Sequence, residues 1–219
     1  MIDYETCLPS HMHHLRRDPS GRPVPLFVQD VDGKPDFRIM NTAHMVRCIH
    51  HHVCWICGGT LGAHEAFVVG PMCVVNLVSS EPPSHLDCAT YSATHCPFLI
   101  NPDKVRRDAN MPDTIPAAGV AILRNPGVSA VIVTKTHTVT RVQQRDNPDA
   151  TPGVLFGIGT PERVVWYTCG RRADRVEVLA ALEQSITSLS DSAREQGPKA
   201  VRTLESAIAN ASLWVPLGD

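Results

Sequence analysis

Apolar residues alternate with polar ones, or form short continuous runs, over many stretches of the chain, which is the pattern of β-strands. Asp32-Gly33 and Gly70-Pro71 are turn pairs between four of these stretches, and Asn125-Pro126-Gly127 is expected to close an antiparallel hairpin. The predicted strands are 26–28, 37–39, 66–69, 73–78, 120–123, 128–133, 134–142, 153–159 and 164–167.

A helical period replaces the strand pattern in the last third of the chain. Asp174 and Glu177 form a capping box, and Gly197-Pro198 separates two amphipathic helices. Their apolar stripes are Val178, Leu182, Ile186, Leu189 and Ala193 in the first helix, and Val201, Leu204, Ile208 and Ala211 in the second. We expect an antiparallel helical hairpin packed on the sheet, although the same hairpin could dock a partner or self-associate.

Two shorter helices are expected nearer the N-terminus. Asn41 or Thr42 caps the first, which covers 43–49. The second is expected to begin at Ser84, because Pro82-Pro83 bars a helix before it and Asp87 occupies the capping-box position. Pro97 ends this second helix.

Two short-spaced pairs of metal-ligand residues dominate the chemistry of the sequence. Cys54 and Cys57 form Cys-x-x-Cys, His85 and Cys88 form His-x-x-Cys, and 27 residues separate the pairs. Thiolate and imidazole are the ligands that tetrahedral zinc prefers, and two such pairs deliver four of them to one ion. Because four protein ligands leave no open position, the pattern predicts a structural zinc site.

Two other interpretations of the cysteines remain open. The Cys-x-x-Cys could be a redox pair, but such pairs usually open a helix, and Gly58-Gly59 disfavours a helix here. An iron–sulfur cluster is the alternative cofactor, because Cys48, Cys73 and Cys96 lie close enough in sequence to complete a four-cysteine set.

Composition points to an intracellular globular protein. Apolar residues make up 43% of the 219, the formal net charge is −2, and no apolar run approaches the length of a membrane span. The N-terminus shows no export pattern, and the cysteines cluster at metal spacing rather than at disulfide spacing. We therefore expect a cytoplasmic protein without a membrane partner.

Basic residues are absent between Arg47 and Lys104, so this segment is a poor surface for phosphate contacts. A protein partner is therefore favoured over nucleic acid. The candidate nucleic-acid residues lie further on: Lys104, Arg106, Arg107, Arg141 and Arg145. The other histidines are expected to be solvated, namely His11, His13 and His14 in a flexible arm, the run from His50 to His52, and His137 on a surface strand.

Four stretches together resemble a family of uncharacterised bacteriophage and prophage proteins: Cys-Trp-Ile-Cys-Gly-Gly-Thr-Leu-Gly, Phe-Val-Val-Gly-Pro-Met-Cys, Glu-Pro-Pro-Ser-His-Leu-Asp-Cys-Ala and His-Cys-Pro-Phe-Leu. The resemblance covers residues 20–100 and implies a phage or bacterial cytoplasmic setting. The paired-ligand frame is also similar to the zinc scaffold of HNH-type nucleases. Those enzymes carry an Asp-His or similar pair on the hairpin between the halves, where this chain has Val-Val-Gly-Pro.

The expected fold class is α+β, in three parts: a flexible arm at 1–25, a treble-clef-like zinc module at 26–100, and a small antiparallel β region with the helical hairpin at 101–219. The expected function is that of a zinc-stabilised accessory or regulatory protein that binds a host or phage macromolecule. The alternative is an enzyme such as an HNH-like, metal-dependent nuclease acting on DNA. Its polar candidates near the metal are His64, Glu65, Asn76 and His95.

Overall fold

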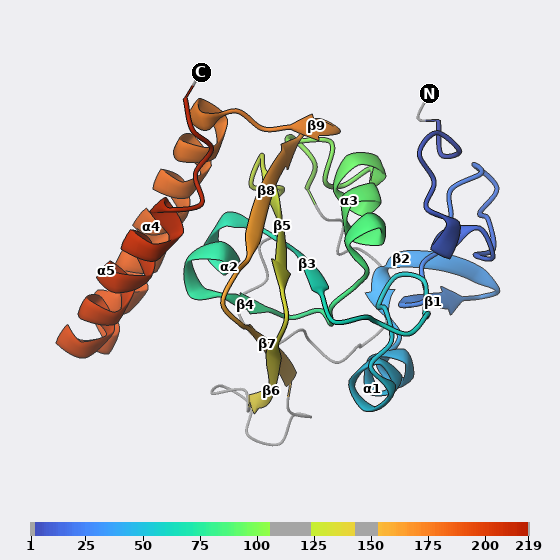
Figure 1. Cartoon of the computed structure of the whole chain (residues 1–219), viewed down its shortest axis with the longest axis horizontal. Coiled ribbons are helices and arrows are strands. Elements are labelled where there is room, and N and C mark those ends of the chain that lie inside the picture. The colour runs from blue at the N-terminus through green and yellow to red at the C-terminus, as the bar shows by residue number, and fades with distance from the viewer. Residues whose placement is uncertain (1–2, 106–123, 143–152, 219) are drawn as a thin grey trace.

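The computed structural model describes residues 3–105, 124–142 and 153–218 (Figure 1). Its helices are η1 (Ser10–Met12), α1 (Thr42–His51), α2 (Pro71–Asn76), α3 (Leu86–His95), α4 (Arg175–Gln196) and α5 (Pro198–Ser212). Its strands are β1 (Val28–Val31), β2 (Lys34–Met40), β3 (Glu65–Val69), β4 (Val78–Ser79), β5 (Ser129–Thr134), β6 (His137–Val142), β7 (Gly153–Ile158), β8 (Arg163–Thr168) and β9 (Arg171–Arg172). The predicted strand at 120–123 lies outside the described residues.

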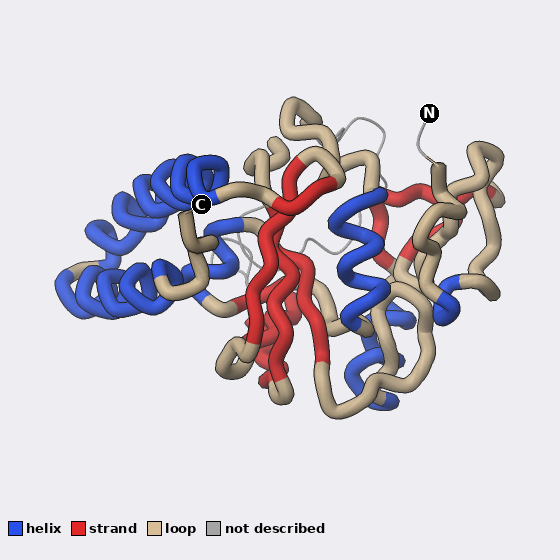
Figure 2. The backbone as a smooth tube through the Cα atoms, turned by 45° about the horizontal axis from the view of Figure 1, so that its top comes forward, coloured by secondary structure: helices blue, strands red, loops and turns tan. Residues whose placement is uncertain are grey.

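The fold is a mixed α/β arrangement in which every described strand pairing is antiparallel. A four-stranded sheet has the order β3-β5-β8-β9, a three-stranded sheet has the order β4-β7-β6, and β1 pairs with β2. Helix α3 lies on one face of the larger sheet, and α2 with the α4–α5 hairpin lies on the other (Figures 1 and 2). The predicted combination of antiparallel strands and a C-terminal helical hairpin is confirmed.

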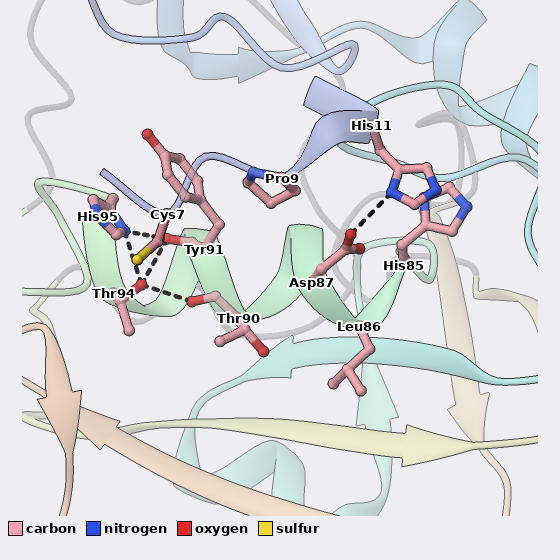
Figure 3. A pocket seen from close by; sticks show the side chains of 10 residues that line it. All are labelled: Cys7, Pro9, His11, His85, Leu86, Asp87, Thr90, Tyr91, Thr94 and His95. Atoms are coloured by element: carbon pink, nitrogen blue, oxygen red, sulfur yellow. Dashed lines mark hydrogen bonds and ion pairs between the residues drawn. The ribbon is translucent and has the colours of Figure 1, made fainter. Parts of the chain in front are cut away.

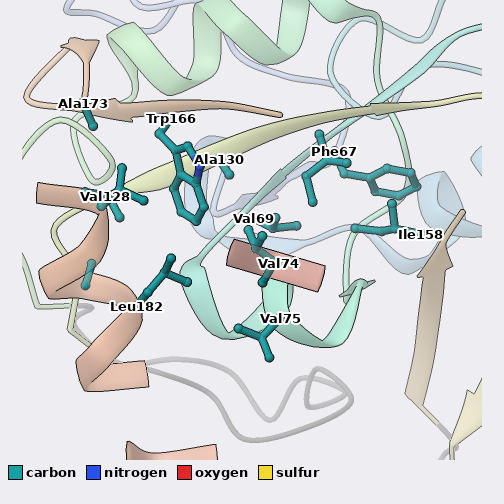
Figure 4. Packing of buried hydrophobic residues seen from close by; sticks show 14 of the residues in the cluster. Phe67, Val69, Val74, Val75, Val128, Ala130, Ile158, Trp166, Ala173 and Leu182 are labelled. Carbon is teal, nitrogen blue, oxygen red and sulfur yellow. The ribbon is translucent and has the colours of Figure 1, made fainter. Parts of the chain in front are cut away.

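Strand β5 is buried along its whole length, and its central residues 130–133 are apolar, as expected for a strand with both faces covered. Ala130 and Ile132 point into the core under α2 and α4, where they join Phe67 and Trp166 (Figure 4). Val131 points to the opposite face and joins a cluster with Ala89 of α3. Since successive strand residues alternate between faces, one strand serves two cores, and α3 is fixed against the sheet.

Helix α2 replaces the strand predicted at 73–78. Gly70 is its N-cap and Pro71 occupies its first turn, while Leu77 ends it in the left-handed conformation with φ 49°. The strand prediction followed the β-branched valines, but Val74 and Val75 are buried in the core, and α2 packs against α4 and α5. Tertiary burial together with proline at the helix start therefore outweighs the local strand preference.

Three predicted helix starts can be compared with the structure. The Asn41 side chain caps α1 by accepting from the His44 amide at 3.0 Å, and the Asp174–Glu177 capping box opens α4, so both predictions are confirmed. Helix α3 differs, because His85 rather than Ser84 is its N-cap. Ser84 instead forms an antiparallel bridge with Ala66, which withdraws it from the helix.

Residues 3–25 pack in part against the body of the protein, although His11, His13 and His14 are exposed as the sequence predicts. Met12 is only 1% exposed and packs among the residues around Cys54. The Tyr91 hydroxyl donates to the Tyr4 carbonyl at 2.6 Å, and Arg17 forms a bridge with Pro23. The segment is therefore anchored to the body of the protein at several points along its length.

His137 is not the surface residue that the strand pattern predicts. Its side chain is 16% exposed, and Nδ1 donates to the Glu65 carboxylate at 2.6 Å. The Nε2 atom of His52 lies 3.4 Å from the other oxygen of Glu65, whose side chain is only 4% exposed. A buried carboxylate needs such partners, and this contact ties β3 to β6 and to the end of α1.

We expect His137→Ala to lower the free energy of unfolding by about 3–5 kcal/mol, because it removes the closest partner of a buried carboxylate. Urea unfolding measures the change. His50→Ala is the matched control, because His50 is an exposed histidine of α1. In a Glu65→Gln background the same removal should cost far less, since no charge is left unpaired. Equal effects of His137→Ala and His50→Ala would contradict this role.

Candidate metal centre

The first ligand pair lies on a tight turn that backbone hydrogen bonds close on both sides. Val53 and Thr60 form an antiparallel bridge, the Cys54 amide donates to the Gly59 carbonyl at 2.7 Å, and the Gly58 amide donates to the Cys54 carbonyl at 2.8 Å. Gly58 has φ +76°, a conformation that glycine adopts without strain. The chain thereby turns both sulfurs of the pair toward the same side.

The second ligand pair is carried by the start of α3, which the sheet holds next to this turn. The bridge between Ala66 and Ser84 fixes the chain just before His85, and the Trp55 amide donates to the Pro83 carbonyl at 3.0 Å. His85 is the N-cap of α3, and Cys88 lies in its first turn. The helix start therefore projects both side chains toward the Cys-x-x-Cys turn.

The four side chains named by the sequence pattern converge in space. One ligand atom from each of Cys54, Cys57, His85 and Cys88 lies within 4.8 Å of the other three. His85 Nδ1 is 3.3 Å from the Cys57 sulfur and 3.9 Å from the Cys88 sulfur. Nitrogen and sulfur ligands of a tetrahedral zinc ion lie about 3.5 Å apart, so these distances suit such an ion. These residues are placed to bind a metal ion.

Backbone amides and a carbonyl orient the ligands. The Cys54 sulfur accepts from the Cys57 and His85 amides, each at 3.4 Å, and the Cys57 sulfur accepts from the Gly59 amide at 3.4 Å. His85 Nε2 donates to the Thr60 carbonyl at 2.9 Å, which leaves the lone pair on Nδ1, beside the sulfurs. Amide donors of this kind stabilise thiolates, the form that binds metal.

Three thiols this close cannot all ionise unaided in a buried site. Hydrogen bonds from Cys57 and Cys88 hold the pKa of Cys54 far below its usual range. Donating to the Cys54 sulfur raises the pKa of Cys57 to about 11, and donating to both other sulfurs raises the pKa of Cys88 strongly. A bound divalent cation would favour three thiolates, because it lowers the pKa of each coordinating thiol and displaces the protons.

The cysteines of the iron–sulfur alternative lie elsewhere in the described structure. Cys48 is buried with Val53 and Trp55, and burial raises its pKa to about 12. Burial also raises the pKa of Cys73 and of Cys96. Among the described residues, none of these three belongs to the group whose ligand atoms meet.

The polar candidates of the nuclease alternative are each engaged away from that group or exposed. His64 Nε2 contacts Glu162 at 3.1 Å, and Glu65 is bound by His137 as described above. His95 stacks on Tyr91 with ring centroids 4.2 Å apart. Asn76 is exposed at the end of α2. In the part of the chain that is described, the four do not form one polar site beside the metal ligands.

Two hollows flank the metal ligands. One, of about 600 Å³, follows α3 from His85 to His95 beneath residues 7–11, and Asp87 and Tyr91 line it (Figure 3). The other, of about 750 Å³, lies beside Gly58, and its lining includes Arg16 and Arg47.

Arg16 and Arg47 thus line the same hollow as the metal ligand Cys57, although the sequence has no Lys or Arg between Arg47 and Lys104. The sequence-based candidates for nucleic-acid contact are only partly described. Lys104 and Arg141 are exposed, and Arg106, Arg107 and Arg145 lie outside the described residues. That surface stays a prediction. None of the helices in the described ranges combines the length and apolar character needed to cross a bilayer.

Comparisons with protein-family models, with curated proteins and with solved structures found no match to this chain. No family is therefore assigned. The metal centre is the most completely defined group of chemically reactive side chains in the described structure.

We expect Cys88→Ala to lose the metal and cooperative unfolding together, because metal binding and folding are coupled at such sites. Elemental analysis of the purified variant and a thermal melt measure the two effects. Cys7→Ala and Cys169→Ala, at exposed cysteines, are the matched controls and should keep both properties. Stoichiometric metal with an unchanged melting temperature in Cys88→Ala would show that the ligand set is wrong.

Proposed function

We propose that this chain is a zinc-stabilised binding protein built around a treble-clef-like module. The turn closed by Val53 and Thr60 serves as the knuckle, the bridge between Ala66 and Ser84 as the hairpin, and α3 as the helix that supplies the last ligands. Helix α2 is inserted between the two hairpin positions. This order of elements supports the treble-clef assignment.

The convergence of three sulfurs and one imidazole nitrogen is the observation that carries the proposal. Zinc prefers this ligand set in tetrahedral geometry, and four protein ligands leave no position for a substrate or an activated water. Zinc would then contribute folding free energy rather than catalysis. In this protein it would hold the Cys-x-x-Cys turn against the start of α3.

The partner is proposed to be a protein, because large apolar side chains are exposed together where α4 begins and α5 ends. Val176 and Leu179 belong to the first turns of α4, and Leu213 and Leu217 follow α5. Arg175 donates to the Pro216 carbonyl at 2.8 Å, which holds the C-terminal residues beside α4. We call these four residues the terminal apolar patch. Exposed apolar groups that gather in this way are typical of protein-binding surfaces.

An accessory or regulatory role in a phage or bacterial cell fits this reading, and that is the setting implied by the sequence resemblance. A closed zinc centre provides a rigid support, and the α4–α5 hairpin presents the terminal apolar patch at its open end. Net charge is −2, so no overall positive field favours nucleic acid as the partner.

We expect a Val176→Ser, Leu217→Ser double variant to lose a partner protein that the unaltered chain captures from bacterial lysate, because the patch loses two strongly exposed apolar side chains. Quantitative mass spectrometry of crosslinked complexes identifies the partner. A Val46→Ser, Val139→Ser variant is the matched control, since both valines are exposed elsewhere. If both variants captured the partner protein equally well, docking at the terminal apolar patch would be contradicted. A monomer–dimer difference in light scattering would identify a second copy as the partner instead.

The geometry does not favour the nuclease alternative, which needs a general base and an open coordination position beside a metal. We expect no cleavage of plasmid or single-stranded DNA when magnesium, manganese or zinc is supplied. Gel assays over a range of protein concentrations measure this. Metal-dependent cutting that disappears in His64→Ala would overturn the expectation and establish an enzyme.

A further inference from the structure

Residues 4–15 form a continuous strap that lies over the metal centre, and none of them belongs to the group of four ligands. The 3-10 helix η1 in its middle is closed by the Met12 amide, which donates to the Pro9 carbonyl at 2.8 Å. The strap contacts both ligand-bearing elements, the Cys-x-x-Cys turn and α3. These elements are far from it in sequence.

Met12 is the apolar plug of this strap. It is 1% exposed and belongs to the same buried cluster as Cys54, Cys57 and Cys88. The three cysteines are at most 4% exposed, so their sulfurs are shielded from solvent while the strap is in place. His85 is the only ligand that is not fully buried. A chelator in solution therefore meets very little of the thiolate surface in this arrangement.

Polar contacts fasten the strap on both sides of the plug. His14 Nε2 donates to the carbonyl of Cys57 at 3.0 Å. The His11 ring stacks on the ring of His85 with centroids 4.3 Å apart, and its Nδ1 donates to Asp87 at 2.9 Å (Figure 3). The strap thus contacts Cys57 at its backbone carbonyl and His85 at its imidazole ring.

We propose that the strap controls metal exchange: zinc leaves or enters only when residues 4–15 lift from the centre. The proposal rests on the metal centre proposed above. The strap is held by one fully buried side chain, by the partly buried Leu8 and Leu15, and by a few half-exposed polar contacts. A short segment with so few buried groups belongs to the part of a fold that opens locally, without global unfolding. Because coupling between two binding events is reciprocal, bound metal must also hold the strap closed.

The rate of zinc transfer to a chromogenic chelator in excess tests the first half of the proposal. Met12→Ser removes the plug and His14→Ala removes a fastening, and both are expected to keep one zinc per chain. We expect transfer to accelerate on the order of tenfold or more for Met12→Ser, because the closed state loses its buried apolar contacts. His13→Ala is the matched control, since His13 is exposed on the same turn.

Limited proteolysis tests the second half. The Arg16–Arg17 bond lies just beyond the strap, and Arg17 forms the bridge with Pro23. Trypsin should cut this bond faster in the metal-free protein than in the zinc-loaded protein. In zinc-loaded Met12→Ser the cutting rate should rise toward that of the metal-free protein, whereas His13→Ala should match the unaltered chain.

Unchanged transfer rates in both Met12→Ser and His14→Ala, with one zinc bound, would overturn the strap as a barrier. Loss of zinc from both variants at equilibrium would also overturn it, because the strap would then be part of the binding energy and not a gate. Retention of zinc by Cys88→Ala would refute the metal centre itself, whatever the Met12 variant does. The two failures are therefore distinguishable.

Discussion

Three largely buried thiols and one partly buried imidazole meet in one place, and this convergence is the constraint on which the module depends. Hydrogen bonding lowers the pKa of Cys54 while it raises the pKa of Cys57 and Cys88, so the group holds little negative charge without a cation. A divalent ion removes this conflict by accepting three thiolates at once. Three segments that are distant in sequence then become one unit: the strap, the Cys-x-x-Cys turn and α3.

The central sheet supplies the frame for that unit. Strand β5 is buried on both faces, and α3 packs on the face opposite α4 and α5. The position of His85 and Cys88 is therefore fixed by the apolar core on which α3 packs. Glu65 adds a second tie at the start of β3, because its buried carboxylate binds imidazoles from α1 and β6. Core and metal centre thus hold α3 from opposite sides.

Local signals in the sequence were sufficient for the ligand set and for several elements. Two pairs of ligands at short spacing define the centre before any fold is known, and Asp174 with Glu177 marks the start of α4. Contacts between distant residues account for the rest. Val74 and Val75 have strand preference but lie in a helix because the core buries them, and Met12 is buried by elements that follow it in sequence.

The same limit applies to the polar residues around the site. The sequence around His137 indicates a strand but gives no sign of its partner. Only the arrangement of strands distant in sequence brings His137 to Glu65. His11 and His14 lie in a segment without periodic pattern, so no local signal connects them to the metal ligands. The pairing of Asp87 with His11 is likewise a contact between residues far apart in sequence. The apolar residues Leu8, Met12 and Leu15 within this polar segment were the available signal that it packs against the body.

X-ray absorption spectroscopy of the metal in the purified protein tests the central claim most directly. The account predicts a zinc edge with three sulfur neighbours at about 2.3 Å and one nitrogen neighbour at about 2.0–2.1 Å. An iron edge, four sulfur neighbours, or a first shell made mainly of oxygen and nitrogen would contradict it.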